Sequence, residues 1–436
     1  MPPHPLTTID PSKPAAIGQG IDYELFLDCV HCGLCTSACP TYVELGTEMD
    51  SPRGRIYLMR GVVDGRIPLD NDVKQHLDLC LNCRACETAC PSGVQYGRLI
   101  EPFRNDLVKT NQATRNLPWW QRLVIFNIFP YPWRARLALA PAKLLQWLRL
   151  DRVMAKIMPS RIRAMQEMLP RLKSLPALPE FLPAEGKKRA TVGLLTGCIN
   201  DVVLRHVNWA TAKVLQKNGC DVWTPRSQGC CGALHLHAGL EVPAIQFAEK
   251  LCDTMLSRDG IDAFVTNVAG CGSTLKDYAH LLAHTPYAEK GTKFQVKVKD
   301  INEFLMELGP IKPTHPLKIR ATYHDACHLC HAQKIRQAPR DLLNLIPGLE
   351  LVPLNESEIC CGAAGSYNLT QPEMAERLGK RKSDNLLATH PEAVFTANAG
   401  CLLQIAKHLR ADHPNIWVAH PVEALWASYS GEKCNV

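Results

Sequence analysis

The chain has 436 residues, 46% hydrophobic and 21% charged, with a mild net charge of +7; these values fit a globular protein of several domains. The first residues lack the charged and apolar regions of a signal peptide, and no apolar run reaches the ~20 residues of a membrane helix, so we expect a cytoplasmic protein. Its 20 cysteines far exceed ordinary usage, and in a reducing compartment they favour metal or redox sites over disulfides.

Residues 1–20 are rich in proline and glycine, and we expect them to be disordered. A short helix from Ile21 to Leu27 then leads into a cysteine pattern that occurs twice. The first copy is Cys29, Cys32, Cys35 and Cys39 before Pro40, and the second is Cys80, Cys83, Cys86 and Cys90 before Pro91.

Both copies have the spacing C-x2-C-x2-C-x3-C-P, which is typical of proteins with two 4Fe-4S clusters. Three thiolates two residues apart fit a loop around one cluster, and the fourth turns toward the other cluster. Zinc sites also use the C-x2-C spacing, but a zinc ion gains nothing from a third cysteine at the same spacing or from the proline that ends the motif. The spacing therefore predicts two cross-ligated clusters in residues 21–110, the first on Cys29, Cys32, Cys35 and Cys90, the second on Cys80, Cys83, Cys86 and Cys39.

Between the two motifs, Ser51 and Pro52 have the types preferred at a helix N-cap and first position, which predicts a helix through Val63. Arg53, Arg55 and Arg84 lie near the motifs. Their positive charge would offset that of an anionic cluster and raise its potential, unless they are solvated surface residues.

Residues 111–186 form a basic, aromatic connector. It contains Trp119, Trp120, Trp133 and Trp147, and between Arg115 and Lys173 its net charge is +10. We expect short helices broken by Pro118, Pro130, Pro132 and Pro141. Their apolar faces would pack on the protein's own core, on a partner subunit, or on the inner face of the cell membrane as a peripheral contact. Nucleic acid is not expected, because no nucleic-acid-binding motif accompanies the charge.

From about residue 187 the pattern is α/β. Buried strands are expected over Thr191–Thr196, Asp262–Asn267 and Phe294–Val298, and an amphipathic helix over Asn208–Lys217. No G-x-G-x-x-G follows these strands, so the dinucleotide-binding fingerprint is absent from the sequence.

Cysteine landmarks recur in this half of the chain. The pair Cys230-Cys231 and Cys271 recur 130 residues further on (230 to 360, 271 to 401), and Cys198 recurs as Cys327. A common period indicates two duplicated domains, 187–312 and 313–436. Strand ends meet at one edge of an α/β sheet, so each domain can gather four thiols into an additional metal or redox site: Cys198, Cys230, Cys231 and Cys271 in the first, and Cys327, Cys360, Cys361 and Cys401 in the second. His235, His237, His324 and His328 flank these thiols, as ligands or as structural residues.

The repeat resembles the "CCG" domains of the cysteine-rich subunit of heterodisulfide reductase. The whole chain, from about Tyr23 to Leu425, resembles the family of glycolate oxidase (glycolate dehydrogenase) iron–sulfur subunits. The matching stretches are Val30–Gly33, Ser51–Ile56, Cys90–Val94, Gly229–Ala233, Tyr323–His328 and Cys360–Thr370. The expected fold is α+β and multidomain: a helical ferredoxin-type domain with two 4Fe-4S clusters, a helical connector, and two duplicated α/β CCG domains.

The resemblance implies an electron-transfer subunit without a substrate-oxidising site of its own. In such complexes an FAD-binding partner oxidises glycolate to glyoxylate, and electrons pass through the iron–sulfur subunit toward a quinone-type acceptor. An equivalent subunit of lactate or glycerol-3-phosphate oxidation, or a non-catalytic redox-sensing scaffold, are the alternatives.

The sequence departs from the related CCG domains at one point in each repeat. Thr274 and Gln404 stand where the relatives have the last cysteine of a C-x2-C pair. For these domains an ordinary cluster, another metal and a redox thiol site all remain open.

Overall fold

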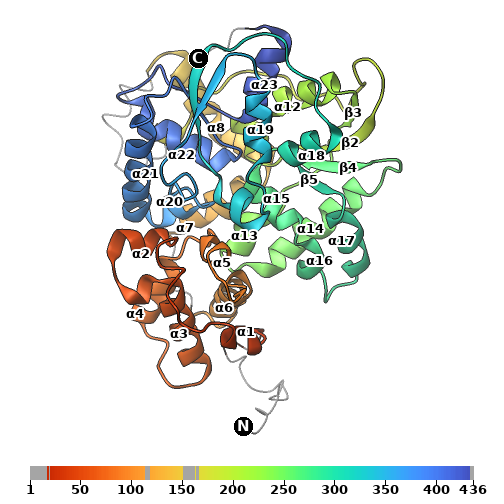
Figure 1. Ribbon diagram of the computed structural model, residues 1–436. Helices are drawn as coiled ribbons and strands as arrows, with labels where there is room; N and C mark the ends of the chain where they lie inside the picture. Colours follow the sequence, from red (N-terminus) through yellow and green to blue (C-terminus); the bar gives the residue numbers. More distant parts are fainter. Residues whose placement is uncertain (1–16, 19, 113–117, 151–162, 164–165, 433–436) are drawn as a thin grey trace.

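The computed structural model describes residues 17–18, 20–112, 118–150, 163 and 166–432. A helical N-terminal part lies at one end of the molecule, and two α/β parts lie side by side above it (Figure 1). The disorder expected for residues 1–20 falls mainly on positions 1–16 and 19, outside the described residues.

Helices alone make up the described N-terminal part: α1 (Glu24–Leu27), α2 (Pro40–Leu45), the 3-10 helix η1 (Glu48–Asp50), α3 (Pro52–Val63), α4 (Asn71–Asp78), α5 (Ala85–Thr88) and α6 (Gly97–Lys109). The predicted start of α3 is confirmed, because the Ser51 hydroxyl accepts from the Gly54 N–H and Pro52 takes the first position. Phe26, Met59 and Phe103 form the centre of its core. These helices hold the two cysteine loops between them.

In the connector, α7 (Trp119–Arg122) runs into a π-helix, η2 (Leu123–Ile128), and α8 (Pro132–Trp147) follows. The expected break at Pro141 is wrong, because Pro141 lies inside α8 on its exposed side. There the carbonyl that loses its N–H partner can bond to water, so the helix continues. Residues 151–162 and 164–165 of the connector lie outside the described residues.

The first repeat contains a sheet in the order β1-β3-β2-β4-β5, parallel except for β1. Its strands are β1 (Phe181–Leu182), β2 (Ala190–Leu195), β3 (Cys220–Trp223), β4 (Ala263–Thr266) and β5 (Val298–Asp300). Its helices are α11 (Asn200–Val203), α12 (Arg205–Lys217), α13 (Ala233–His237), α14 (Glu241–Met255), α15 (Ala269–Leu275), α16 (Tyr278–Leu281), α17 (Ala288–Gln295) and α18 (Ile301–Leu308).

One of the three expected strands was misplaced. Phe294 belongs to α17, and its ring stacks on Phe264 and Tyr278 in the core. The strand begins only at Val298. A short apolar run cannot be assigned to a helix or a strand by its periodicity alone.

The second repeat has the all-parallel order β7-β6-β8-β9, which matches β3-β2-β4-β5. Its strands are β6 (Ile319–Tyr323), β7 (Leu349–Val352), β8 (Ala393–Phe395) and β9 (Trp417–Ala419). Its helices are the π-helix η3 (His328–Ala332), α19 (Ala338–Asn344), α20 (Tyr367–Thr370), α21 (Pro372–Leu387), α22 (Ala399–Arg410) and α23 (Pro421–Ser430). One hydrophobic core joins the repeats, and it includes Val192 and Leu215 of the first and Phe395 and Leu425 of the second.

Candidate metal centres

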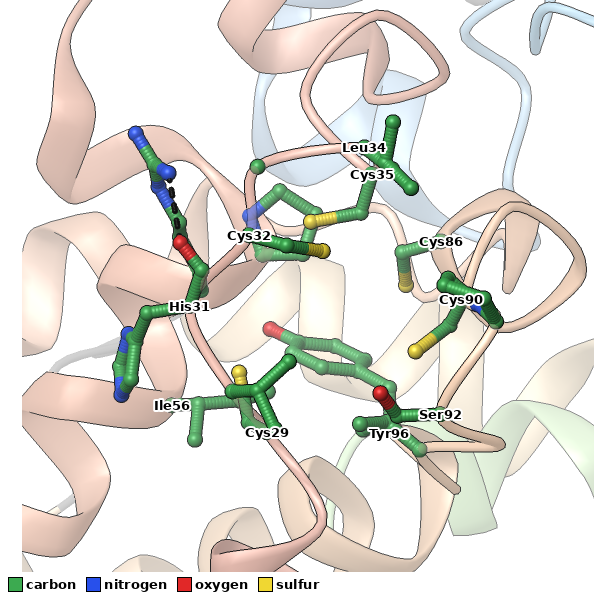
Figure 2. A pocket seen from close by; sticks show the side chains of 16 residues that line it. Cys29, His31, Cys32, Leu34, Cys35, Ile56, Cys86, Cys90, Ser92 and Tyr96 are labelled. Atoms are coloured by element: carbon green, nitrogen blue, oxygen red, sulfur yellow. Dashed lines mark hydrogen bonds between the residues drawn. The ribbon is translucent and has the colours of Figure 1, made fainter.

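The first cysteine loop surrounds a hollow with an empty volume of about 410 Å³. Figure 2 shows the side chains of Cys29, Cys32, Cys35 and Cys90 around it, together with Cys86 and the ring of Tyr96. The rest of the lining is largely apolar and includes Leu34, Ile56 and Val94. A hollow lined by thiols and apolar groups suits an iron–sulfur cluster.

A second hollow, with an empty volume of about 320 Å³, is lined by Cys39, Cys80, Cys83 and Cys86. Cys39 belongs to the first motif in sequence but lines the hollow of the second, and Cys90 lines that of the first. This placement is the one that cross-ligation requires. Cys86 lines both hollows, and its assignment to the second cluster stays a prediction.

The two loops share a backbone conformation that suits an anionic cluster. In each loop, both residues that flank the second cysteine have a positive φ angle. They are His31 (φ 54°) and Gly33 (φ 87°) in the first loop, and Asn82 (φ 53°) and Arg84 (φ 63°) in the second. Such residues turn successive N–H groups to one side, as in the anion-binding nests of many iron–sulfur sites. Glycine suits position 33 because L side chains rarely adopt its φ of 87°, and a Cβ there would displace the Arg53 guanidinium (2.6 Å).

Two buried cations lie beside the second hollow. Arg55 is 1% exposed and donates from Nη1 to Cys39 Sγ (3.8 Å) and Thr41 Oγ1 (3.0 Å). Arg104 donates to the carbonyls of Leu77 and Cys80. Burial by itself raises the pKa of Cys80, but the charges of Arg55 and Arg104 bring it below its ordinary value. The second hollow therefore favours thiolates and added negative charge.

Each of the three arginines singled out from the sequence pairs with a carboxylate, and the partner of Arg55 is the buried Asp50 (3.3 Å). Arg53 is partly exposed and pairs with Glu48 (2.6 Å) while it donates to the His31 carbonyl. The side chain of Arg84 is 17% exposed, and Glu101 (3.1 Å) offsets its charge. Arg104, which the sequence analysis missed, lies 24 residues from Cys80, and only the packing of α6 brings it there.

The first repeat gathers its four thiols at the carboxyl ends of β2, β3 and β4. Cys198 Sγ lies 3.6 Å from Cys230 Sγ, Cys231 contacts Cys230 and Cys271, and all but Cys271 are fully buried. Because Cys230 and Cys271 donate to it, and despite its burial, the pKa of Cys231 lies well below its ordinary value. At Gly232 (φ 80°) a Cβ would lie 3.0 Å from the Ala244 carbonyl oxygen, which explains the glycine after the pair.

The second repeat gathers its four thiols in the same way. Side-chain contacts link Cys327 to Cys360, Cys360 to Cys361, and Cys361 to Cys401, and all four are buried. Gln404, which replaces the relatives' last cysteine, uses its amide to contact Asn368 and the Ala375 carbonyl. The two sets of thiols predicted from the repeat are thus brought together, one set in each repeat.

The second cysteine loop is also the point where the N-terminal part meets both repeats. Asn82 contacts His237 of the first repeat through its amide (3.2 Å), and its carbonyl accepts from His328 Nε2 of the second (3.0 Å). Burial, with the charge of His237, lowers the pKa of His328 to about 3, so its ring is neutral. Cys83 shares an apolar cluster with Cys327 and Cys360. The second hollow therefore adjoins the thiols of the second repeat.

The histidines near the thiols have different roles. His237 and His328 hold the cysteine loop, as just described, and their rings meet at 5.1 Å. His235 packs between the rings of Phe126 and Phe247. His324 lies with Cys361 and Cys401.

Comparison with protein families supports this division of the chain. Residues 26–94 match the family described as "4Fe-4S dicluster domain". Residues 192–276 and 321–406 each match "Cysteine-rich domain", and residues 116–169 match "Glycolate oxidase iron-sulfur subunit, linker region". Iron–sulfur clusters of the 4Fe-4S type are therefore the cofactors of the N-terminal part, in agreement with the thiol-lined hollows.

Among curated proteins, the chain is 37% identical to the "Probable glycolate oxidase iron-sulfur subunit" of Bacillus subtilis (strain 168), over 89% of this chain and 90% of that protein. It is 35% identical to the "Glycolate oxidase iron-sulfur subunit" of Escherichia coli (strain K12), over 87% and 89%. "Lactate utilization protein A" of Oceanobacillus iheyensis is 30% identical over 54% of this chain and 96% of that protein.

Proposed function

Because the chain belongs to the family of glycolate oxidase iron–sulfur subunits, we propose that it carries electrons from an FAD-binding partner, which oxidises glycolate to glyoxylate, toward a quinone-type acceptor. That it is an iron–sulfur electron-transfer subunit of an oxidoreductase complex follows from the family. The proposed path of the electrons rests on a contrast between the two hollows. The first hollow opens to the surface at Cys32, and the second faces the repeats through Cys83.

Each 4Fe-4S cluster accepts and releases single electrons, which is the chemistry that links a two-electron flavin to a distant acceptor. We assign Cys29, Cys32, Cys35 and Cys90 to the first cluster and Cys80, Cys83, Cys86 and Cys39 to the second. The lining of the two hollows supports this assignment.

The surface around the first hollow is suited to receive the flavoprotein. Cys32 is exposed, and Val30 (66%) and Leu34 (59%) expose apolar side chains on either side of it. Exposed apolar groups beside a cofactor commonly mark a protein contact. We assign this surface to the electron donor.

Charge gives the relay its direction. A positive charge close to a cluster stabilises the reduced state and raises the potential. Arg104 and Arg55 are buried beside the second hollow, and of these Arg55 pairs with the buried Asp50 (3.3 Å). Beside the first hollow lies the partly exposed Arg53, which pairs with Glu48. Reduction is therefore favoured at the second site, next to the repeats.

A second surface suits the acceptor side. Along α8, Trp133, Leu137, Leu144 and Trp147 form an exposed stripe at helical spacing. From residue 118 to residue 150 the sequence has five Lys or Arg and no Asp or Glu: Arg122, Arg134, Arg136, Lys143 and Arg149. Of these cations, Arg136 pairs with Asp201. An apolar face flanked mainly by cations is complementary to an anionic bilayer, where quinones dissolve. We assign this face to peripheral membrane contact.

The placement of these surfaces fits a relay. The first cysteine loop belongs to the lower end of the molecule in Figure 1, and α8 lies toward the upper end. Among the described helices, none is both long and apolar enough to cross a bilayer.

The runner-up function is the equivalent subunit of lactate oxidation. It is favoured by the similarity of 54% of this chain to a lactate utilization protein.

The substrate test is reconstitution under anaerobic conditions. The chain is combined in turn with FAD-binding subunits for glycolate, lactate and glycerol-3-phosphate, each substrate is added, and cluster reduction is followed by EPR. Reduction by glycolate with its partner supports the proposal. Reduction by lactate or glycerol-3-phosphate only would assign the chain to that complex, and reduction by none would favour a redox-sensing scaffold.

A further inference from the structure

His324 follows β6 directly and lies at the thiols of the second repeat. Its side chain is 0% exposed. One of its ring nitrogens and the sulfurs of Cys361 and Cys401 all lie within 4.8 Å of one another. Within the described part of the chain, this is the one group of three or more His, Cys, Asp or Glu ligand atoms that comes so close.

The hydrogen bonds of His324 decide which nitrogen is available. Nδ1 donates to the Ser357 carbonyl (3.0 Å), so its lone pair is not free and Nε2 is the unprotonated nitrogen of a neutral ring. Nε2 is buried and has no hydrogen-bond partner. A buried polar atom without a hydrogen-bond partner is destabilising, and a bound metal ion would satisfy it. Metal-bound histidines typically show this arrangement, with the other ring N–H donated to a carbonyl.

A cation accompanies these groups. Lys382 is 2% exposed, donates to the carbonyls of Glu356 and Ser357, and lies close enough to Cys360, Cys361 and Cys401 for their charges to affect it. The Ser357 carbonyl thus contacts both His324 and Lys382. A buried ammonium group offsets the negative charge of neighbouring thiolates.

The first repeat lacks both groups. Leu195 stands three residues before Cys198, as His324 stands three before Cys327, and it is 4% exposed. Gly232 and Gly362 lie against Ala244 and Ala375, which makes these alanines equivalent and places Leu251 where the second repeat has Lys382. At these two equivalent positions the first repeat has leucines, whereas the second has an imidazole and an ammonium group.

We propose that the second repeat binds a metal centre to which His324 Nε2 is a ligand, together with the thiolates of Cys361 and Cys401. The first repeat has Leu195 at the equivalent position and cannot supply this ligand. This inference is independent of the identity of the hydroxy acid.

The donor set restricts the metal. Thiolate with neutral imidazole suits Zn²⁺ or iron, the latter alone or in a cluster, and not the hard cations Mg²⁺ and Ca²⁺. Metal–sulfur bonds are about 2.3 Å and metal–nitrogen bonds about 2.0–2.1 Å, so donors of one ion lie no more than about 4.5 Å apart. The observed limit of 4.8 Å is close to that value and needs only small side-chain adjustments.

The test uses the full chain, purified anaerobically, and compares the wild type with His324→Ala. Zinc and iron are measured per folded chain, zinc coordination by X-ray absorption, and the coupling of ¹⁴N to paramagnetic iron by pulsed EPR. If the metal is zinc, the wild type has a mixed nitrogen–sulfur shell and His324→Ala loses the zinc. If it is iron, a ¹⁴N coupling is present in the wild type and lost in the variant.

The matched control is His235→Ala. His235 is also buried and also has an unpaired Nδ1, but it lies between two phenylalanine rings. We expect its removal to leave metal content and spectra unchanged.

His324→Cys is a second variant, which replaces the nitrogen with sulfur and serves if His324→Ala does not fold. Retained metal with loss of the nitrogen signature supports the proposal. Metal content and nitrogen signature that are unchanged in the His324 variants would overturn it.

Discussion

Cys39 shows at the level of one residue how the two cysteine motifs are interlocked. It belongs to the first motif in sequence, yet its sulfur contacts Thr41 and Arg55 at the hollow of the second. Pro40 begins α2 directly after it, so the chain turns away and Cys39 is left facing the other loop. The spacing of the cysteines predicts this exchange without any knowledge of the fold.

We therefore predict that Cys39→Ala removes the second cluster and leaves the EPR signal of the first. Cys252→Ala is the control, because Cys252 is equally buried but lies far from both motifs in the core of the first repeat. Loss of the first signal with retention of the second would show that the ligand assignment is wrong.

Arg55 is the residue expected to set the potential of the second cluster. In Arg55→Met the buried charge is lost, and Coulomb's law at about 8 Å and an effective dielectric constant of about 20 gives a fall on the order of 100 mV. Arg53→Met should change the first potential less, because solvent screens the partly exposed Arg53, whereas Arg55 and its partner Asp50 are both buried. A redox titration followed by EPR measures both. Equal shifts in the two variants would contradict the role of burial.

How far the sequence predicts these residues depends on their spacing. The eight cysteines are recognised because they are two or three residues apart, and the repeat thiols because they recur at one period. Arg104 and His324 carry no such signal. The first is brought to Cys80 by α6, and the second is distinguished from an ordinary core histidine only by its unpaired nitrogen.

At the scale of elements, the second cysteine loop and α6 connect the N-terminal part to the repeats. Glu101 of α6 pairs with Arg84 (3.1 Å), accepts from the Asn82 amide (2.6 Å) and contacts His237 of the first repeat (3.1 Å). Burial alone would raise the pKa of Glu101, but the charge of Arg84 and the bond to His237 bring it well below its ordinary value. Glu101 is thus ionised in the folded protein.

Replacement of Glu101 by Gln should lower the free energy of unfolding by about 3 kcal/mol, because it leaves the mostly buried Arg84 without its partner. Denaturant titration of the anaerobic protein measures this. Glu87→Gln is the control, since Glu87 lies 3.9 Å from Arg84, and we expect less than about 1 kcal/mol.

The same pair predicts a pH dependence. A carboxyl whose pKa is lowered on folding stabilises the fold above its unfolded pKa, near 4.5, and this stabilisation is lost as the pH falls through the folded value. The difference between wild type and Glu101→Gln should be complete at neutral pH and shrink below pH 4.5. A difference that grows on acidification would contradict the ionised state.

Element boundaries were predicted best where a local signal exists. Ser51 and Pro52 mark the start of α3, and a short run of mostly apolar residues marks the buried strand β2. The prediction is wrong at Phe294 and Pro141, because the tertiary structure decides the secondary structure at both positions. A ring stack holds Phe294 in a helix, and solvent tolerates the missing hydrogen bond at Pro141.

For the whole molecule, the exposed stripe of α8 gives a prediction about membranes. Simultaneous Trp133→Ala and Trp147→Ala substitutions should reduce binding to vesicles that contain anionic lipid at least tenfold, because two aromatic anchors are lost. The control is Trp119→Ala with Val242→Ala, two exposed apolar side chains outside α8, which should bind as the wild type does. Equal binding by all three proteins, or equal binding to neutral vesicles, would contradict membrane docking through α8.

The arrangement of the whole molecule could be anticipated only in part. The period of the cysteines predicts two α/β repeats, but not that one core joins them, nor that the second cysteine loop lies between His237 and His328. Such contacts join residues far apart in the chain, and no local pattern records them.

We expect the N-terminal cysteines to hold two 4Fe-4S clusters that transfer single electrons. The most direct test is the measurement of iron and acid-labile sulfide per chain, with EPR before and after reduction, on anaerobically purified protein. We expect iron and sulfide for at least two 4Fe-4S clusters per chain and, on reduction, two interacting EPR signals. A colourless protein with zinc and without sulfide would contradict it.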